Sequence, residues 1–141
     1  MKALILAAGK GTRLRPLTSK TPKILLKFGN SNILDYLVNC LKENNVNEIY
    51  VVTGYKSDQI KKKFKGEVNF ILNKKYQTTN SIYSLFLAKK KLNNSNFFLI
   101  NGDILISKKY LKIDEKNKKK SFTYGIKKKR VKLGEMNLVI K

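Results

Sequence analysis

The stretch that decides the fold of this chain is Ala3-Leu4-Ile5-Leu6-Ala7-Ala8-Gly9-Lys10-Gly11-Thr12-Arg13. Its apolar first half has the length of a β-strand, and two glycines separated by one residue follow it. Glycine permits positive φ angles and leaves successive backbone N–H groups open to an anion. Thr12 adds a hydroxyl, and Arg13 adds a planar guanidinium that pairs with phosphate oxygens. The stretch therefore predicts a strand followed by a loop that binds nucleotide phosphates.

The spacing of the glycines excludes two common phosphate loops. A Walker loop has a glycine, four residues and then Gly-Lys-Ser/Thr, an order that Gly9-Lys10-Gly11-Thr12 does not supply. The dinucleotide-binding fingerprint needs a third glycine at position 14, which is leucine here. The loop therefore belongs to another class.

Residues 6–23 resemble the signature of the sugar-phosphate nucleotidyltransferases, Leu-Ala-Ala-Gly-x-Gly-Thr-Arg-Leu followed by Pro-x-Thr and Pro-Lys. The resemblance implies transfer of a nucleoside monophosphate from a nucleoside triphosphate to a small phosphorylated acceptor, with release of pyrophosphate and with Mg²⁺ as cofactor. It implies that the backbone at Leu6, Ala8 and Gly9 contacts base and ribose, with Ala7 in the same binding stretch, and that Gly11, Thr12 and Arg13 hold the triphosphate. Lys23 would neutralise charge on the transferring phosphoryl group.

Apolar periodicity downstream of the loop predicts strands alternating with helices. The strands are predicted at 2–7, 48–53, 68–72 and 96–100, and the helices at 33–44, 58–65 and 81–92. The helix N-caps are predicted at Ser31 or Asn32, at Ser57 and at Asn80. This order predicts an α/β fold with a Rossmann-like, doubly wound and mostly parallel sheet.

Three further expectations concern packing. Strand 96–100 is a near-continuous apolar run, so we expect it to be central and buried on both faces. The prolines at 16 and 22 are expected to interrupt any helix and to hold the loop open and extended. Four residues of the helix at 81–92 are expected to face the core, namely Ile82, Leu85, Phe86 and Ala88.

Polar residues follow three of the predicted strands at the point where each strand ends. They are the glycine loop with Arg13, the segment from Asn73 to Ser81, and Asp103 in a Gly-Asp step. In doubly wound sheets, ligands bind outside the carboxyl ends of the strands. A carboxylate there can bind a magnesium ion shared with phosphate oxygens, and the resemblance places a metal-binding aspartate at this step. Arg13, Lys23 and Asp103 are therefore the predicted catalytic residues.

The segment from Asn73 to Leu85 is predicted to choose the base and the acceptor. Its Asn…Tyr…Asn-Ser…Ser-Leu pattern resembles the phosphocholine cytidylyltransferase branch, and it lacks the Gln-x-Pro…Gly sequence usual in sugar-phosphate members. Asn80 and Ser81 are thus candidate binding residues. Tyr76 and Tyr83 could offer aromatic faces to a quaternary ammonium group, although tyrosines at the rim of an ordinary helix would look the same. CTP with phosphocholine is the favoured substrate pair, and a sugar 1-phosphate is the second choice of acceptor.

The formal charge of +22 also suggests a nucleic-acid-binding protein. Only 3 of the 31 basic residues are arginine, however, and lysine clusters recur along the whole chain. We therefore favour solvated lysine faces over a specific nucleic-acid surface. The chain has no histidine, one cysteine (Cys40) and no apolar run of membrane-spanning length, so we expect no membrane partner and a cytoplasmic location.

The chain of 141 residues is expected to form a single domain over 1–141. Strands are predicted at 121–126 and 136–140, and Glu135 to Val139 resemble the strand at which the second half of the family's domain begins. The resemblance thus covers the N-terminal part of that domain, which we expect to be incomplete at its C-terminus. The alternative function is a catalytically weak or inactive nucleotide-binding or regulatory remnant.

Overall fold

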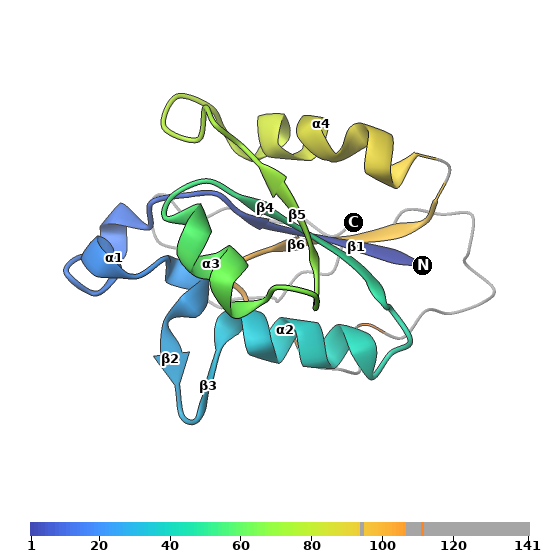
Figure 1. Ribbon diagram of the computed structural model, residues 1–141, viewed down its shortest axis with the longest axis horizontal. Helices are drawn as coiled ribbons and strands as arrows, with labels where there is room; N and C mark the ends of the chain where they lie inside the picture. The colour runs from blue at the N-terminus through green and yellow to red at the C-terminus, as the bar shows by residue number, and fades with distance from the viewer. Residues whose placement is uncertain (94, 107–110, 112–141) are drawn as a thin grey trace, which may run out of the picture.

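β1 (Lys2–Ala7) lies in the interior of a four-stranded parallel sheet with the order β5-β4-β1-β6 (Figure 1). The other strands are β4 (Glu48–Thr53), β5 (Asn69–Leu72) and β6 (Phe97–Asn101). The structure is a computed structural model that describes residues 1–93, 95–106 and 111. The chain builds outward from β1 to β4 and β5, and then returns to place β6 on the opposite side of β1. The predicted α/β, Rossmann-like, doubly wound sheet is therefore confirmed.

Helices cover both faces of the sheet (Figure 1). α2 (Ile33–Lys42) and α3 (Ser57–Lys63) lie on one face, and α4 (Ser81–Leu92) lies on the other. Alternate residues of a strand point to opposite faces, so Ala3 and Ile5 pack in the core beside α2 and α3 while Leu4 packs beside α4. All three of these β1 side chains are fully buried. The apolar run in β1 thus supplies both cores.

The loop after β1 is folded rather than extended, which corrects the expectation drawn from its prolines. It contains η1 (Thr12–Leu14) and α1 (Leu17–Lys20), and η2 (Lys23–Leu25) follows it. Pro16 and Pro22 directly precede α1 and η2, and their carbonyls accept the first hydrogen bonds of these turns, from Ser19 N at 3.0 Å and Leu25 N at 2.9 Å. A proline at a helix start loses no hydrogen bond, because the first N–H groups of a helix have no partner within it. A small hairpin, β2 (Lys27–Phe28) and β3 (Ser31–Asn32), leads into α2.

Two of the predicted N-caps are confirmed and one is wrong. Asn32 caps α2 by accepting from Asp35 N at 2.9 Å, and Asn80 caps α4 by accepting from Tyr83 N at 3.2 Å. Ser57 instead lies inside α3, where its hydroxyl bonds to that of Thr53 at 2.9 Å. This bond to the end of β4 takes the serine side chain away from capping.

The predicted core face of α4 is wrong in part. Ile82 and Phe86 are 72% and 63% exposed, whereas Ser84, Ala88 and Leu92 are buried. Small side chains let the helix approach the sheet closely, and the hydroxyl of Ser84 accepts a hydrogen bond from Asn73 Nδ2 at 3.1 Å. This polar contact helps to set the rotation of the helix, which the apolar pattern alone did not reveal.

Strand β6 is not buried on both faces, contrary to the prediction. Among the described residues it is the last strand of its sheet, and Phe97 and Leu99 are 38% and 50% exposed. α4 packs over β1 and β4, which leaves this face of β6 less covered. On the opposite face, Ile100 is buried in the core formed with α2.

Several predictions fall outside the described residues. These are the strands at 121–126 and 136–140 and the family-like segment 135–139. Within the described part of the chain, no helix is both long and apolar enough to cross a bilayer.

Gly54, directly after β4, is a position at which the fold leaves no room for a side chain. A Cβ there would lie 2.6 Å from Tyr76 Cβ and 2.7 Å from the carbonyl oxygen of Ala8. We expect Gly54→Ala to lower the free energy of unfolding by roughly 1–3 kcal/mol, because overpacking forces the backbone apart. Urea unfolding measures the change. Gly9→Ala is the matched control, since an added Cβ meets no atom within 4 Å, and an equal loss in both variants would contradict the packing argument.

The amino ends of β1 and β4 carry a small polar cluster that predicts a pH dependence. The hydroxyl of Tyr50 donates to Glu48 Oε1 at 2.6 Å, and Lys2 Nζ lies 3.2 Å from the same oxygen. The Tyr50 hydrogen bond first, and Lys2 second, hold the pKa of Glu48 below its ordinary value of 4.5. A lowered pKa in the folded state means that this stabilisation is present above about pH 4.5 and is lost as the pH falls through the folded-state pKa.

We therefore expect Glu48→Gln to reduce the free energy of unfolding at pH 7, with the difference from wild type shrinking below about pH 4.5. Denaturant unfolding at a series of pH values measures this. Asp58→Asn is the control, because it also removes one exposed carboxylate from the surface. A Glu48→Gln difference that stays constant from pH 7 to pH 3 would contradict the assignment.

Candidate functional site

A polar hollow of about 460 Å³ lies at the carboxyl ends of β1, β5 and β6. The strand order reverses between β1 and β6, so their two following loops diverge and leave a crevice at this point. We call it the switch-point hollow. The end of β1 and the loop after it contribute six lining residues that were predicted from the sequence, namely Leu6, Ala7, Ala8, Gly9, Gly11 and Arg13.

The hollow also collects predicted residues from distant parts of the chain. Lys23 from η2, Asn80 and Ser81 from the start of α4, and Asp103 after β6 all line it. Thr12 is the predicted binding residue that does not line it, because it begins the exposed turn η1. The structure therefore brings together most of the predicted set.

Gly11 gives the loop its shape. Its φ is +64°, and a Cβ there would lie 3.1 Å from Thr18 Cγ2 and 3.3 Å from Lys23 Cβ. A left-handed residue against two neighbours favours glycine for both conformation and space. The buried Thr18 hydroxyl donates to the Gly11 carbonyl oxygen at 2.8 Å. These contacts fold the loop back on itself without any ligand.

Tyr55, which follows β4, forms hydrogen bonds near both ends of the same loop. Its backbone N–H donates to the Ala8 carbonyl at 2.9 Å. Its hydroxyl lies 3.1 Å from Thr18 O and 2.8 Å from Ser19 O. Nothing in the local sequence signalled this role, since a tyrosine two positions after a strand is common in ordinary turns. The loop is thus held from both of its ends.

Lys23 and Asp103 form an ion pair on the wall of the hollow. Lys23 Nζ lies 2.9 Å from Asp103 Oδ2, and the two side chains are 29% and 45% exposed. Partial exposure screens such a pair, so we assign it little stabilising energy. The position of the pair matters more than its energy, because the pair links η2, which follows the glycine loop, to the segment after β6. A mobile cation and a carboxylate are thereby placed side by side.

The two tyrosines proposed for a quaternary ammonium group have different surroundings. Tyr76 lines the hollow, and its ring centre is 6.4 Å from that of Tyr55. Tyr83 does not line it, and its ring lies 6.2 Å from Phe86 on the exposed side of α4. Only Tyr76 of the pair therefore offers its ring to this site.

Asn73 was treated in the sequence as the start of a polar loop, but the structure buries it. Its side chain is 1% exposed and lies on the wall of the hollow beside Ser84. Asparagine at the end of a strand usually indicates a turn. The available signal was the pairing of Asn73 with two hydroxyl residues, Thr79 and Ser84, in one short segment.

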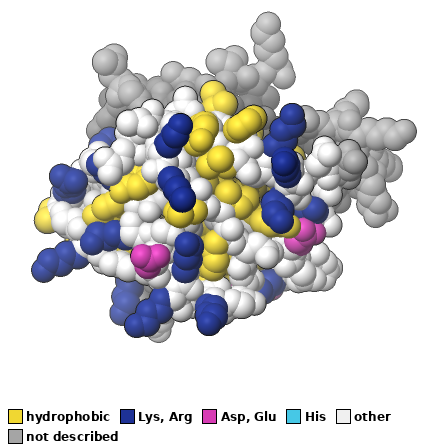
Figure 2. All heavy atoms as spheres, turned by 45° about the horizontal axis from the view of Figure 1, so that its top comes forward, with side chains coloured by type: hydrophobic (Ala, Val, Ile, Leu, Met, Phe, Trp, Pro, Cys, Tyr) yellow, Lys and Arg dark blue, Asp and Glu magenta, His cyan; other side chains and the backbone are white. Residues whose placement is uncertain are grey.

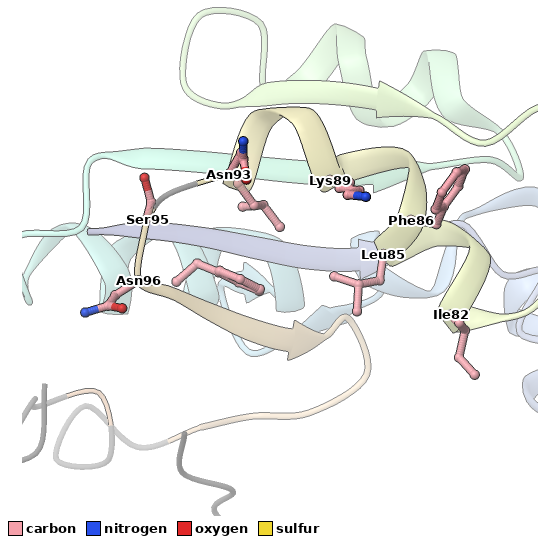
Figure 3. A pocket seen from close by; sticks show the side chains of 9 residues that line it. Ile82, Leu85, Phe86, Lys89, Asn93, Ser95 and Asn96 are labelled. Atoms are coloured by element: carbon pink, nitrogen blue, oxygen red, sulfur yellow. The ribbon is translucent and has the colours of Figure 1, made fainter. Parts of the chain in front are cut away.

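A second hollow of about 680 Å³ runs along α4 and the start of β6 (Figure 3). We call it the α4–β6 groove. Its lining is largely apolar, with Ile82, Leu85 and Phe86 along the helix and Lys89 as its charged side chain. None of the predicted binding residues lines it, and the candidate site is therefore the switch-point hollow.

On the face seen in Figure 2, the described basic side chains do not gather in one patch. Lys and Arg side chains are scattered there among apolar and neutral ones. The last turns of α3 and α4 each carry three of these lysines. The pattern fits solvated helix faces. It gives no reason to move the site away from the switch-point hollow.

The family of the chain follows from comparison with known proteins. A family model described as nucleotidyl transferase matches residues 2–134. The chain belongs to the nucleotidyl transferase family. The match includes every strand and helix described here, and the switch-point hollow lies within it.

Two curated relatives narrow the type of nucleotidyl transferase. A choline-phosphate cytidylyltransferase of Streptococcus pneumoniae is 40% identical over 117 residues, which cover 81% of this chain and 49% of the relative. A CTP:phosphoglutamine cytidylyltransferase of Campylobacter jejuni is 45% identical over 92 residues, which cover 63% of this chain and 36% of the relative. The chain spans about half the length, or less, of these relatives. Both relatives are named for cytidylyl transfer.

A solved structure supports the same family assignment. The CTP:phosphocholine cytidylyltransferase from S. pneumoniae matches this nucleotidyl transferase with a TM-score of 0.62 and 41% identity. The match covers 72% of this chain and 44% of that one. The predicted resemblance to the nucleotidyltransferases, and to the phosphocholine branch among them, is therefore confirmed.

Arg13 offers a direct test of the candidate site. We expect Arg13→Ala to weaken binding of a nucleoside triphosphate by roughly 1.5–3 kcal/mol, the range for a hydrogen bond to a charged group. Isothermal calorimetry measures the affinity. Arg15→Ala is the control, because Arg15 carries the same charge but is exposed and does not line the hollow. Equal effects of the two substitutions would show that net charge, and not this site, determines binding.

Proposed function

We propose that this chain provides the nucleotide-binding part of a cytidylyltransferase. The reaction would move CMP from CTP to a small phosphorylated acceptor and release pyrophosphate. The observation that carries the proposal is the Lys23–Asp103 ion pair at 2.9 Å, beside the glycine loop in the switch-point hollow. It places a cation for phosphate next to a carboxylate suited to a metal. We also propose that residues 1–141 belong to a single domain.

The phosphate loop would bind the triphosphate mainly through its backbone. Its N–H groups between Gly9 and Arg13 are donors for phosphate oxygens, and the guanidinium of Arg13 can pair with two oxygens at once. Leu6, Ala7 and Ala8 would lie against the base and ribose. Nucleotidyl transfer needs little covalent work from the protein, so orientation and charge stabilisation would supply the rate.

Lys23 would act on the charge that develops during transfer. Its ammonium group moves on a flexible stem, so it can leave Asp103 for an oxygen of the transferring phosphoryl group. Asp103 would then be free to turn to a metal ion. The existing ion pair keeps both groups at the right place before the nucleotide arrives.

The residues present fit a magnesium ion. Magnesium is commonly bound by one or two carboxylates together with substrate phosphates, and Asp103 supplies a carboxylate with Oδ1 free of hydrogen bonds among the described residues. No cluster of three Asp, Glu, Cys or His side chains that could hold a metal occurs in the described part of the chain, so the phosphates would complete the shell. When bound, Mg²⁺ would neutralise phosphate charge and polarise the reacting phosphorus.

Phosphocholine is the favoured acceptor, and a sugar 1-phosphate is the second choice. Tyr76 supports phosphocholine, because its ring lines the hollow and an aromatic face attracts a quaternary ammonium group. The relative named for phosphoglutamine shows that acceptors differ among similar sequences. The acceptor is therefore the part of the proposal that most needs direct measurement.

The test combines substrate choice with a charge-removing variant. Pyrophosphate release is measured with CTP, UTP, GTP and ATP, each with phosphocholine or glucose 1-phosphate, and nucleotide affinity is measured by calorimetry. We expect CTP to bind tightest and CTP with phosphocholine to react fastest. Lys23→Met is expected to lower the rate by about 10²–10³-fold, as for loss of one group that stabilises transition-state charge.

Lys27→Met is the control for that variant, since Lys27 is exposed in β2 and does not line the hollow. Equal affinity for all four nucleotides would overturn the assignment to CTP. Unchanged binding and turnover in Lys23→Met would remove the switch-point hollow as the site.

A further inference from the structure

Asn73 directly follows β5, and its side chain is almost completely buried. It is 1% exposed, and its backbone N–H donates to Thr53 O at 2.8 Å. Its Oδ1 accepts from the backbone N–H of Lys75 at 2.9 Å. A backbone N–H can only donate, so this bond fixes which end of the carboxamide is oxygen. The amide nitrogen must therefore face the remaining partners.

Those partners lie on either side of the α4 N-terminus. Asn73 Nδ2 is 3.1 Å from Thr79 Oγ1 and 3.1 Å from Ser84 Oγ. The Thr79 hydroxyl in turn donates a hydrogen bond to Lys75 O at 2.7 Å, which links the two ends of segment 75–79. One buried carboxamide thus ties the loop after β5 to the first turn of α4. All of its polar atoms are satisfied within the described residues.

The residues between these two anchors are the exposed ones that line the switch-point hollow. Asn80 and Ser81 are both exposed, and they stand between Thr79 and Ser84 in the sequence. Asn80 uses Oδ1 to cap α4, and neither its amide nitrogen nor the Ser81 hydroxyl has a hydrogen-bond partner in the described residues. These two groups are therefore available to a ligand.

An exposed loop would normally have to be ordered when a ligand binds, which weakens affinity. Here the loop is already ordered before a ligand binds, because the hydrogen bonds of the buried Asn73 side chain hold it. The same Ser84 contact helps to set the rotation of α4, so the polar groups at its start are placed relative to the sheet. The phosphate loop lies across the hollow and is held by other contacts, through Thr18 and Tyr55.

We propose that Asn73 is a positioning residue that preorganises Asn80 and Ser81 for the base and ribose end of the nucleotide. This proposal rests on the proposed function of the switch-point hollow as a nucleotide site. Asn73 acts through the loop and does not need to touch the substrate. The phosphate loop would be unaffected by its loss.

The test compares two buried asparagines. Asn73→Ala is expected to weaken CTP binding about tenfold, because part of the loop must then order on binding. Asn32→Ala is the matched control, since Asn32 is also 1% exposed and its side-chain oxygen also accepts from a backbone N–H, but it does not line the hollow. Urea unfolding of both variants shows how much stability each loses. Inorganic triphosphate, which lacks base and ribose, is expected to bind Asn73→Ala as it binds wild type.

Hydrogen exchange of the free protein gives a readout that does not depend on nucleotide. We expect faster exchange at the amides of Lys75, Thr79 and Tyr83 in Asn73→Ala, with the amides of η1 and α1 unchanged. Thr79→Val serves as a second variant, because it keeps the side-chain shape and removes one acceptor of the Asn73 amide. It should reproduce part of the effect even if Asn73→Ala folds poorly.

Asn73→Asp provides a conservative rescue. A protonated carboxylic acid keeps one acceptor and one donor in nearly the same shape, and burial raises the pKa of a carboxyl group. The ratio of variant to wild-type Kd for CTP is therefore expected to fall between pH 8 and pH 5.5. A generally destabilised protein would not recover affinity on acidification.

The outcomes separate this inference from the proposed function. If wild type binds CTP but Asn73→Ala binds it equally well, the positioning role is overturned and the site assignment stands. Equal weakening by Asn32→Ala, or equal weakening for inorganic triphosphate, also overturns it. If wild type binds no nucleoside triphosphate, both proposals fall.

Discussion

The whole structure depends on the interior position of β1. Its residues Ala3, Leu4 and Ile5 are fully buried, and its backbone pairs with β4 on one side and β6 on the other. A strand that is apolar on both faces is stable only when layers of helix cover both sides of the sheet. The alternation of the chain between the two faces, and the reversal of strand order beside β1, follow from this requirement. The glycine loop therefore begins where the crevice opens.

The close approach of loops to this crevice depends on two further glycines. Gly54 leaves space for Tyr76 and for the Ala8 carbonyl, and a Cβ at Gly102 would lie 2.7 Å from the Leu6 carbonyl oxygen. The Gly102 N–H also donates to that oxygen at 2.8 Å. These contacts bring the residues after β4 and β6 against the backbone at the end of β1, at Ala8 and Leu6. Such contacts are rigid, which suits a site that works by orientation.

The strong positive charge has a physical consequence for a polyanionic ligand. A net charge of +22 gives a positive field, which speeds the encounter with a negatively charged molecule and weakens as salt is added. It gives little selectivity, because scattered lysines do not define a geometry. Selectivity has to come from the hollow itself, where Arg13 and Lys23 are placed beside the glycine loop and polar groups face them from α4. The positive field would thus raise the rate of encounter, and the hollow would determine which ligand is bound.

The amino-acid sequence by itself determined the order of the four sheet strands and the three longer helices, the glycine loop after β1 and most of the residues that meet at one edge of the sheet. These features are local, because they depend on the spacing of apolar residues, on glycine backbone freedom and on capping by Asn32 and Asn80. Only the tertiary structure decided which side of α4 is buried, how exposed β6 is among the described residues, and that the loop at Pro16 is helical. It also revealed the Lys23–Asp103 pair and the buried carboxamide of Asn73. The buried side of α4, the exposure of β6 and the Lys23–Asp103 pair depend on contacts between segments far apart in the chain or on the fit of small side chains against a sheet. The turn at Pro16 and the Asn73 carboxamide depend on short-range hydrogen bonds between polar groups. The apolar periodicity of a single segment encodes neither kind of contact.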